Sequence, residues 1–89
     1  MVAILMQHKV EDFAKWKNVF DSALGMRTSS GELSAEVFRD QSDPNSITIL
    51  NKWDSIENAQ KFVQSPDLHA AMTHAGVVGM PSVTFLTEA

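Results

Sequence analysis

The sequence contains no cysteine among its 89 residues. This absence excludes disulfide bonds, thiolate zinc sites and cysteine nucleophiles. Basic residues are also few, because the seven Lys and Arg side chains are scattered from Lys9 to Lys61 and the net charge is −4. Nucleic acids and anionic membrane surfaces bind clustered positive charge, so neither kind of partner is expected.

Long apolar runs are missing as well. The apolar segment at residues 1–6 is too short to span a bilayer, has no basic residues before it and no small-residue cleavage site after it. A buried strand explains this segment better than a signal or an anchor does. We therefore expect a cytoplasmic protein without a membrane partner.

The residues that are present describe a small folded domain. Hydrophobic residues make up 44% of the chain and charged residues 20%, which is typical of a globular protein. One core, spanning residues 1–89, is all that this length allows. Because so small a domain buries only about 60–70% of the surface of its unfolded chain, association with a second copy is the expected source of additional burial.

The hydrophobic pattern predicts four strands and two helices. The strands are expected at 2–9, 33–38, 46–53 and 82–87, with a turn at Asp40 to Asn45 that makes a hairpin of the second and third. The first helix is expected from an N-cap at Asp12 to about Leu24, with an apolar stripe of Phe13, Trp16, Phe20 and Leu24.

The ends of the helices are predicted from capping residues. Gly25 is expected to stop the first helix, and the polar segment 27–31 to be irregular. Asp54 and Glu57 form a capping-box pattern at the start of the second helix. The Ser65-Pro66 pair interrupts that helix and restarts it, and Gly76 ends it, before a turn at residues 79–81.

The resulting order, β-α-β-β-α-β, predicts an α+β ferredoxin-like fold with a four-stranded antiparallel sheet and both helices on one face. Apolar residues nevertheless occur on both sides of the strands. Leu5 faces away from Ile4, Leu50 away from Ile49, and Leu86 away from Phe85. Since the chain has no further element to cover the second face, we predict a homodimer that packs sheet against sheet into a dimeric α+β barrel.

At this point the chain resembles the dimeric α+β barrel superfamily, and in particular its antibiotic-biosynthesis-monooxygenase-like domains. The resemblance covers nearly the whole chain and is carried best by residues 53–59, Trp-Asp-Ser-Ile-Glu-Asn-Ala, followed by Phe62 and the Ser65-Pro66-Asp67-Leu68 break. It implies the barrel dimer. Members of the superfamily include cofactor-free monooxygenases of aromatic quinols, haem-degrading enzymes, isomerases and proteins without a known role.

The sequence departs from these relatives at three places. Phe62 and Asp67 stand where monooxygenase-like members often carry histidines, and Met72 stands where haem-degrading members carry a ligand histidine. Haem chemistry is therefore not implied, and no cofactor is expected. A Gly-rich phosphate loop is also absent, because Gly76 and Gly79 follow a helix instead of preceding one.

Two polar residues are the candidates for catalysis. His8 shares a strand side with Ile4 and Met6 and could act as a base in a pocket, although we favour a strand-end histidine that faces solvent. Asn51 lies in the apolar row of Ile49 and Trp53, so its amide needs a hydrogen-bond partner, which is either a ligand or the backbone.

Six further residues are candidates for ligand binding: Trp16, Phe20, Arg39, Trp53, His69 and His74. The favoured interpretation of the two tryptophans is core packing, and that of His74 is a favourable contact with a helix C-terminus. His69 and His74 are five residues apart and diverge by about 140° on a helix, so no metal site is expected.

Two functions of different classes follow. The first is a homodimer of unassigned function that binds a small aromatic or apolar metabolite in a cleft beside Trp53. The alternative is a cofactor-independent monooxygenase of an aromatic or quinol substrate, in which Asn51 and Arg39 hold the developing anion and a histidine takes the proton. Polar groups aimed at one point of a closed cleft would favour the second.

Overall fold

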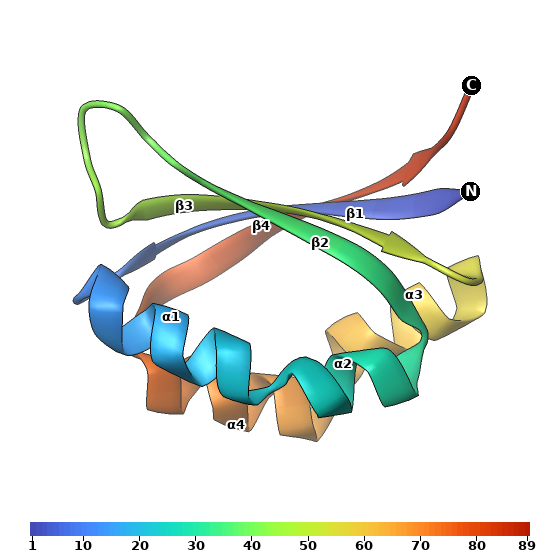
Figure 1. Cartoon of the computed structure of the whole chain (residues 1–89), viewed down its shortest axis with the longest axis horizontal. Helices are drawn as coiled ribbons and strands as arrows, with labels where there is room; N and C mark the ends of the chain where they lie inside the picture. Colours follow the sequence, from blue (N-terminus) through green and yellow to red (C-terminus); the bar gives the residue numbers. More distant parts are fainter.

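The computed structural model describes residues 1–89 and contains four strands and four helices in the order β1-α1-α2-β2-β3-α3-α4-β4 (Figure 1). The strands are β1 (Val2–Val10), β2 (Glu32–Arg39), β3 (Ser46–Trp53) and β4 (Val77–Thr87). The helices are α1 (Phe13–Ser22), α2 (Leu24–Ser30), α3 (Ile56–Gln64) and α4 (Pro66–Ala75). The ferredoxin-like α+β fold is confirmed, with each crossover built from two consecutive helices.

The sheet is antiparallel throughout, with the strand order β2-β3-β1-β4. All four helices lie against one face of it, and the other face carries no element of the chain (Figure 1). The two central strands alternate accordingly. On the covered face they bury Ile4, Met6, His8, Val10, Ile47, Ile49, Asn51 and Trp53.

The first crossover differs from its prediction. Asp12 is the N-cap of α1, as expected, because its Oδ2 accepts a hydrogen bond from the Lys15 amide at 3.1 Å. The chain does not become irregular after Gly25, however. A second helix, α2, continues through residues 27–30 and ends at Gly31, whose φ of +114° is the left-handed conformation that glycine adopts readily.

Gly31 is fixed in place by its neighbours as well as by its backbone angle. A Cβ atom there would lie 2.5 Å from Asp54 Oδ1, so a side chain does not fit without movement of Asp54. The helix stop therefore belongs to Gly31, and the prediction that Gly25 ends the helix was wrong. Leu24, predicted to complete the apolar stripe, is 56% exposed.

The second crossover also has a different cap from the one predicted. Ser55, and not Asp54, caps α3, because Ser55 Oγ accepts from the Asn58 amide at 3.1 Å. Asp54 accepts from the Asn58 side chain instead, at 2.9 Å. The break between α3 and α4 is as predicted, since Ser65 Oγ accepts from the Asp67 amide and Pro66 occupies the first turn of α4. Gly76 ends α4 at a φ of +82°.

The last strand begins five residues earlier than predicted, at Val77 instead of position 82. The turn expected at residues 79–81 is an irregularity within β4, where the pairing with β1 shifts between Gln7 and Lys9. Gly79 has a φ of +72° at this point. A bulge therefore accommodates the residues whose composition suggested a turn.

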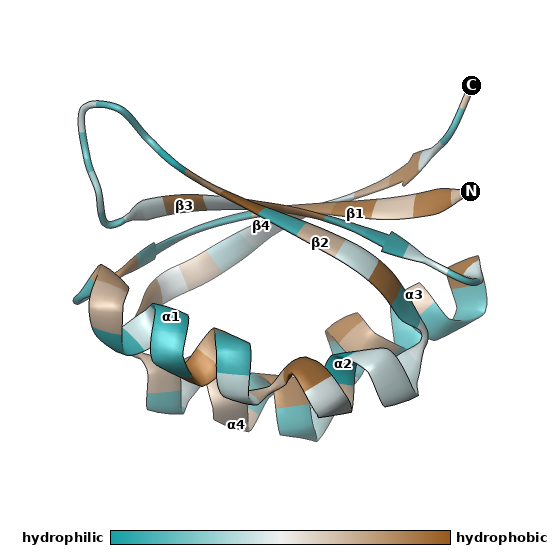
Figure 2. Cartoon of the chain, viewed as in Figure 1, coloured by the Kyte–Doolittle hydropathy of each residue, from teal (hydrophilic) through white to brown (hydrophobic).

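The uncovered face of the sheet, which we call the open face, mixes apolar and polar side chains. Leu5 and Leu50 are direct cross-strand partners at its centre. Phe38 on β2 and Leu86 on β4 flank them and are 52% and 39% exposed. Gln7, Thr48, Glu36 and Lys52 share this face. Apolar residues on both sides of the sheet are thus confirmed. Hydrophobic and hydrophilic residues are interspersed along the strands (Figure 2).

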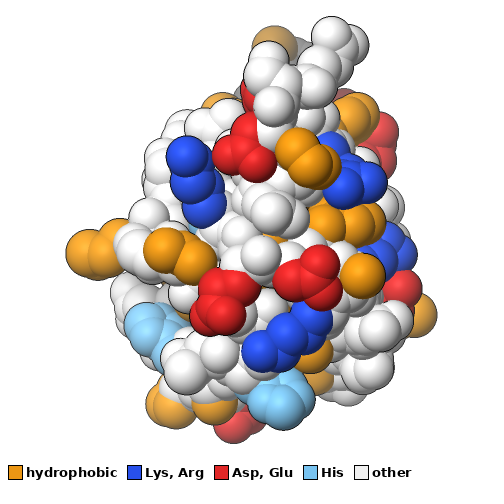
Figure 3. All heavy atoms as spheres, turned by 90° about the vertical axis from the view of Figure 1, so that its left-hand side faces the viewer, with side chains coloured by type: hydrophobic (Ala, Val, Ile, Leu, Met, Phe, Trp, Pro, Cys, Tyr) orange, Lys and Arg blue, Asp and Glu red, His pale blue; other side chains and the backbone are white.

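The side of the molecule shown in Figure 3 has no large patch of a single charge. Acidic and basic side chains are intermingled on this side. None of the four helices combines the length and the hydrophobicity needed to cross a bilayer.

Candidate functional site

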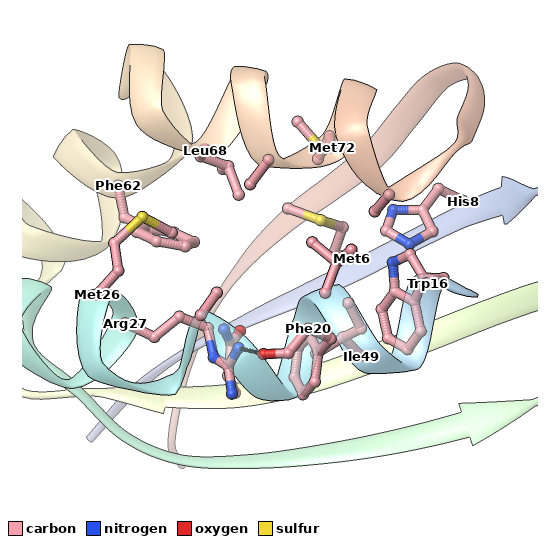
Figure 4. Close-up of a pocket in the computed structure, with 15 residues that line it drawn as sticks. Met6, His8, Trp16, Phe20, Met26, Arg27, Ile49, Phe62, Leu68 and Met72 are labelled. Carbon is pink, nitrogen blue, oxygen red and sulfur yellow. Dashed lines mark hydrogen bonds between the residues drawn. The ribbon is translucent and has the colours of Figure 1, made fainter. Parts of the chain in front are cut away.

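A cavity of about 60 Å³, which we call the inner cavity, lies between the covered face of the sheet and the helices (Figure 4). Fifteen residues line it and twelve of them are hydrophobic. The three polar ones are His8 from β1, Arg27 from α2 and Asn51 from β3. An apolar cavity with a few convergent polar groups is the usual form of a small-molecule site.

His8 is buried in this cavity, with 7% of its surface exposed. Its ring contacts the Trp16 ring edge to face, with centroids 5.7 Å apart and planes at 71°. Neither ring nitrogen has a hydrogen-bond partner in the protein. The prediction that His8 faces solvent was wrong, because β1 extends to Val10 and position 8 lies within the covered face.

Burial sets the protonation state of His8. Desolvation disfavours the imidazolium and lowers the pKa of His8 below its ordinary value of 6.5. At neutral pH the ring is therefore uncharged and has one nitrogen with a free lone pair. A neutral imidazole inside an apolar cavity is equipped to accept a proton from a bound molecule.

The lowered pKa makes stability depend on pH. The unfolded chain binds the proton of His8 more readily than the folded chain does, so we expect the free energy of unfolding to fall as the pH drops from 7.5 to 5.5. The contribution of neutral His8 to the free energy of unfolding is fully present above the pKa of this residue in the unfolded chain. It is lost as the pH falls toward the lower pKa of the folded chain. Urea unfolding of wild type and His8→Phe across this range tests it, and equal slopes for the two proteins would contradict it.

Arg27, Glu32 and Asn51 are buried and form a polar network. Its member Arg27 lies at the end of the cavity away from His8 (Figure 4). Arg27 Nε donates to Glu32 Oε1 at 3.1 Å, and Asn51 Nδ2 donates to Glu32 Oε2 at 3.0 Å. Arg27 Nη1 also donates to the Phe20 carbonyl, and its guanidinium lies 3.7 Å from the centroid of the Phe20 ring. Glu32 thus holds two of the three polar lining residues, Arg27 and Asn51, in place.

The network leaves one acceptor free. Because a carboxylate only accepts hydrogen bonds, the Asn51 atom that contacts Glu32 must be the amide nitrogen. The amide oxygen therefore points away from Glu32. Asn51 Oδ1 is buried and has no partner in the protein. A ligand hydroxyl that donates to this oxygen would satisfy it.

The predicted ligand-binding residues separate into two groups. Trp16 and Phe20 line the inner cavity, where their rings stack with centroids 4.9 Å apart. Trp53 does not line it. Its side chain is fully buried in the core against Phe62, at a centroid distance of 4.8 Å, so the cavity lies beside Trp16 and not beside Trp53.

Arg39 also lies away from the cavity. Its Nε donates to the Pro44 carbonyl at 3.0 Å, and its guanidinium lies 3.9 Å from the centroid of the Phe13 ring. In the sheet Arg39 pairs with Ile47, whereas Asn51 pairs with Ala35. The structure therefore does not bring Arg39 and Asn51 together, and Arg27 is the arginine beside Asn51.

The two remaining histidines are exposed on α4. His69 Nε2 lies 3.2 Å from the Val63 carbonyl oxygen, and His74 lies in the last turn of the helix. Neither lines the inner cavity. No group of three or more His, Asp or Glu side chains is arranged to hold a metal ion.

The family model for antibiotic biosynthesis monooxygenases matches residues 1–74 of the chain. The chain belongs to the antibiotic biosynthesis monooxygenase family. His8, Arg27 and Asn51 all lie within the matched residues, so the polar groups of the cavity belong to the part that defines the family domain.

Solved structures show the same fold for this family member. A Bordetella bronchiseptica protein with a provisional assignment as an antibiotic biosynthesis monooxygenase superposes with a TM-score of 0.82 at 16% identity, covering 99% of this chain and 96% of that one. SnoaB, a cofactor-independent oxygenase from Streptomyces nogalater, gives 0.79 at 15% identity, covering 99% and 92%. Among curated proteins, none matches the chain.

Proposed function

We propose that this family member is a cofactor-independent monooxygenase that oxidises a hydroxylated aromatic compound in the inner cavity. One observation carries the proposal: the same apolar cavity is lined by His8, a neutral histidine whose ring nitrogens have no partner, and by Asn51, whose amide oxygen has none. The description of SnoaB as a cofactor-independent oxygenase supports it.

The residues suggest how such a reaction would proceed. His8 takes the proton of a phenolic hydroxyl, and the resulting phenolate gives one electron to dioxygen. The two radicals join at the para carbon to form a peroxide anion, and the proton held by His8 converts it into a hydroperoxide. Loss of the para hydrogen and cleavage of the oxygen–oxygen bond then give a quinone and one water, so one phenol and one dioxygen are consumed.

The cavity walls contribute to this chemistry in two ways. Asn51 Oδ1 would accept a hydrogen bond from a second hydroxyl of the ring and fix its orientation, while Glu32 holds the amide. Burial in the apolar lining keeps His8 neutral and would strengthen the attraction between the phenolate and the imidazolium once the proton has moved.

Oxygen uptake tests the proposal directly. The protein is incubated with dihydroxynaphthalenes, and dioxygen consumption is followed together with quinone formation by absorbance and mass spectrometry. We expect uptake above the spontaneous rate and one atom of ¹⁸O in the quinone when ¹⁸O₂ is supplied. Binding without uptake above the spontaneous rate for any compound would contradict the enzymatic function.

A second candidate function is ligand binding without catalysis. It is favoured by one feature of the site: no hydrogen bond orients the His8 ring, whereas a catalytic base is usually held by a third group. In this case the same compounds would bind in the cavity and leave unchanged. The uptake measurement therefore separates the two candidates.

We also propose that two copies pack through their open faces, in keeping with the dimeric barrel predicted from the sequence. Leu5, Leu50, Phe38 and Leu86 give this face an apolar centre that no element of the chain covers. Burial of a standard face of about 800 Å² on each copy would add the stabilisation that a small domain lacks. A cytoplasmic location remains a prediction from the sequence.

Leu50→Lys tests the dimer. Each copy would bring one ammonium into the apolar centre, and loss of about 1.5–3 kcal/mol for each buried leucine predicts a dissociation constant at least about 100-fold higher. Sedimentation equilibrium at micromolar concentration should show a dimer for wild type and a monomer for the variant. Ala70→Lys, which adds the same charge on the exposed side of α4, is the control and should stay dimeric.

A further inference from the structure

A second and larger cavity, which we call the outer cavity, lies between α4 and β4. Its volume is about 380 Å³, and seven of its eleven lining residues are hydrophobic. Val83 contributes from the covered face of β4, and Thr73 and His69 contribute from α4. Neither the catalytic chemistry nor the predicted homodimer requires this space.

The two cavities share part of their walls. Met6, Leu68 and Met72 line both, so these three side chains form the partition between them. Met6 extends from β1 and Met72 from α4, and the two side chains approach each other between the sheet and the helix (Figure 4). Methionine is unbranched and has three rotatable bonds, so rotation of these two side chains would open a passage between the cavities without movement of the backbone.

The volumes show why the partition matters. The inner cavity, at about 60 Å³, has room for a few water molecules, whereas sites for small organic ligands span about 300–1,000 Å³. A ring held between His8 and Asn51 must therefore displace some of the lining. The adjacent outer cavity provides the space into which a longer molecule extends.

We propose that the inner and outer cavities form one site for an elongated, largely apolar ligand, whose hydroxylated ring lies at His8 and Asn51 and whose apolar tail passes between Met6 and Met72 into the outer cavity. This inference rests on the proposed ligand site of the inner cavity and adds the shape of the ligand and the location of its tail. His69 and Thr73, both exposed, stand at the mouth of the outer cavity.

A series of 4-alkylphenols, from 4-ethylphenol to 4-octylphenol, tests the inference by isothermal titration calorimetry. The phenol is the probe for the inner cavity, and the chain length reports on the outer one. Once the chain passes the partition, affinity should rise about fourfold for each added methylene, which is the usual gain for burying this group. The rise should end when the outer cavity is filled.

Variants locate the tail. Val83→Phe fills the outer cavity from the sheet and should abolish the rise with chain length, while leaving the affinity for 4-ethylphenol within about twofold of wild type. Thr73→Trp fills it from the exposed side of α4 and gives the same test if Val83→Phe does not fold. Ala70→Trp, on α4 but in neither cavity lining, is the matched control and should keep the rise.

The possible failures are distinguishable. If 4-ethylphenol binds and affinity does not grow with chain length, the two-cavity site is wrong while the inner ligand site stands. A rise that persists in both filled variants places the tail elsewhere and also overturns the inference. If no phenol of any length binds, the inner site of the proposed function fails, and this inference fails with it.

Discussion

Replacing His8 with Phe is expected to lower the rate constant for oxygenation of a dihydroxynaphthalene by about 10²–10⁴-fold, the usual contribution of a positioned general base. Phenylalanine preserves a flat ring against Trp16 but cannot accept a proton. Wild type should show a rate that increases with pH as His8 loses its proton, with a midpoint below 6.5 because burial lowers the pKa of this residue. Stopped-flow oxygen uptake between pH 5 and 8 measures both.

Two controls distinguish catalysis from folding in this experiment. The dissociation constant of the variant for the same compound, measured anaerobically, should stay within about threefold of wild type, so that the loss lies in the chemical step. His74→Gln alters an exposed histidine that lines neither cavity and should keep the full rate. A His8→Phe protein that retains more than a third of the rate would remove His8 from the mechanism.

Replacing Glu32 with Ala is expected to lower the free energy of unfolding by about 3–5 kcal/mol, the usual cost of removing one partner of a buried ion pair. The side chains of Arg27 and Glu32 are 7% and 3% exposed, so the guanidinium would be left without a counter-charge in the core. The Asn51 amide nitrogen would lose its acceptor in the same step. Urea unfolding monitored by circular dichroism measures the change.

The matched control replaces both partners of the ion pair. In the double variant Arg27→Met and Glu32→Leu, neither charge of this pair remains. We expect its free energy of unfolding to exceed that of Glu32→Ala by at least about 2 kcal/mol. The same double variant should bind a hydroxylated ring more weakly, because Asn51 loses the group that orients it. A Glu32→Ala loss below about 1 kcal/mol would show that the ion pair is not buried in solution.

The fold was largely predictable because its signals are local and repeated. Alternation along residues 2–9 and 46–53 and the apolar spacing of Trp16 and Phe20 each report one face of one element. The break at Pro66 and the stop at Gly76 follow from backbone chemistry that hardly depends on context. These features sufficed for the order of elements and for the resemblance to the family.

The charged end of the site was missed for an identifiable reason. In a regular strand Glu32 would share a side with Ser34 and Glu36, away from the helices, and Leu33 would point inward. The pairing of β2 with β3 shifts between Glu32 and Ser34, so Glu32 turns to the covered face opposite Trp53, and Leu33 is 56% exposed. A bulge reverses which residues of a strand face the core, and no residue type at this position of the sequence indicates that a bulge is present.

Arg27 was not predicted as a site residue because the end of the first helical segment was placed at the wrong glycine. Placing the stop at Gly25 made residues 27–31 an irregular polar segment, in which an arginine faces solvent by default. The stop is at Gly31, and the added turn carries Arg27 inward against Phe20. His8 was misplaced for a similar reason, since one further residue at the end of β1 moves it from a strand terminus into the core.

The contrast between the two ends of the site has a consequence for selectivity. At one end, Glu32 clamps Arg27 and Asn51 between the sheet and α2, so this end imposes strict demands on the chemistry of whatever it meets. Where the inner cavity meets the outer one, two of the three shared wall residues, Met6 and Met72, have flexible thioether side chains. Such a protein would discriminate strongly among the hydroxylated rings of its ligands but would accept apolar tails of different length and shape. This suits a series of related compounds that share one oxygenated ring.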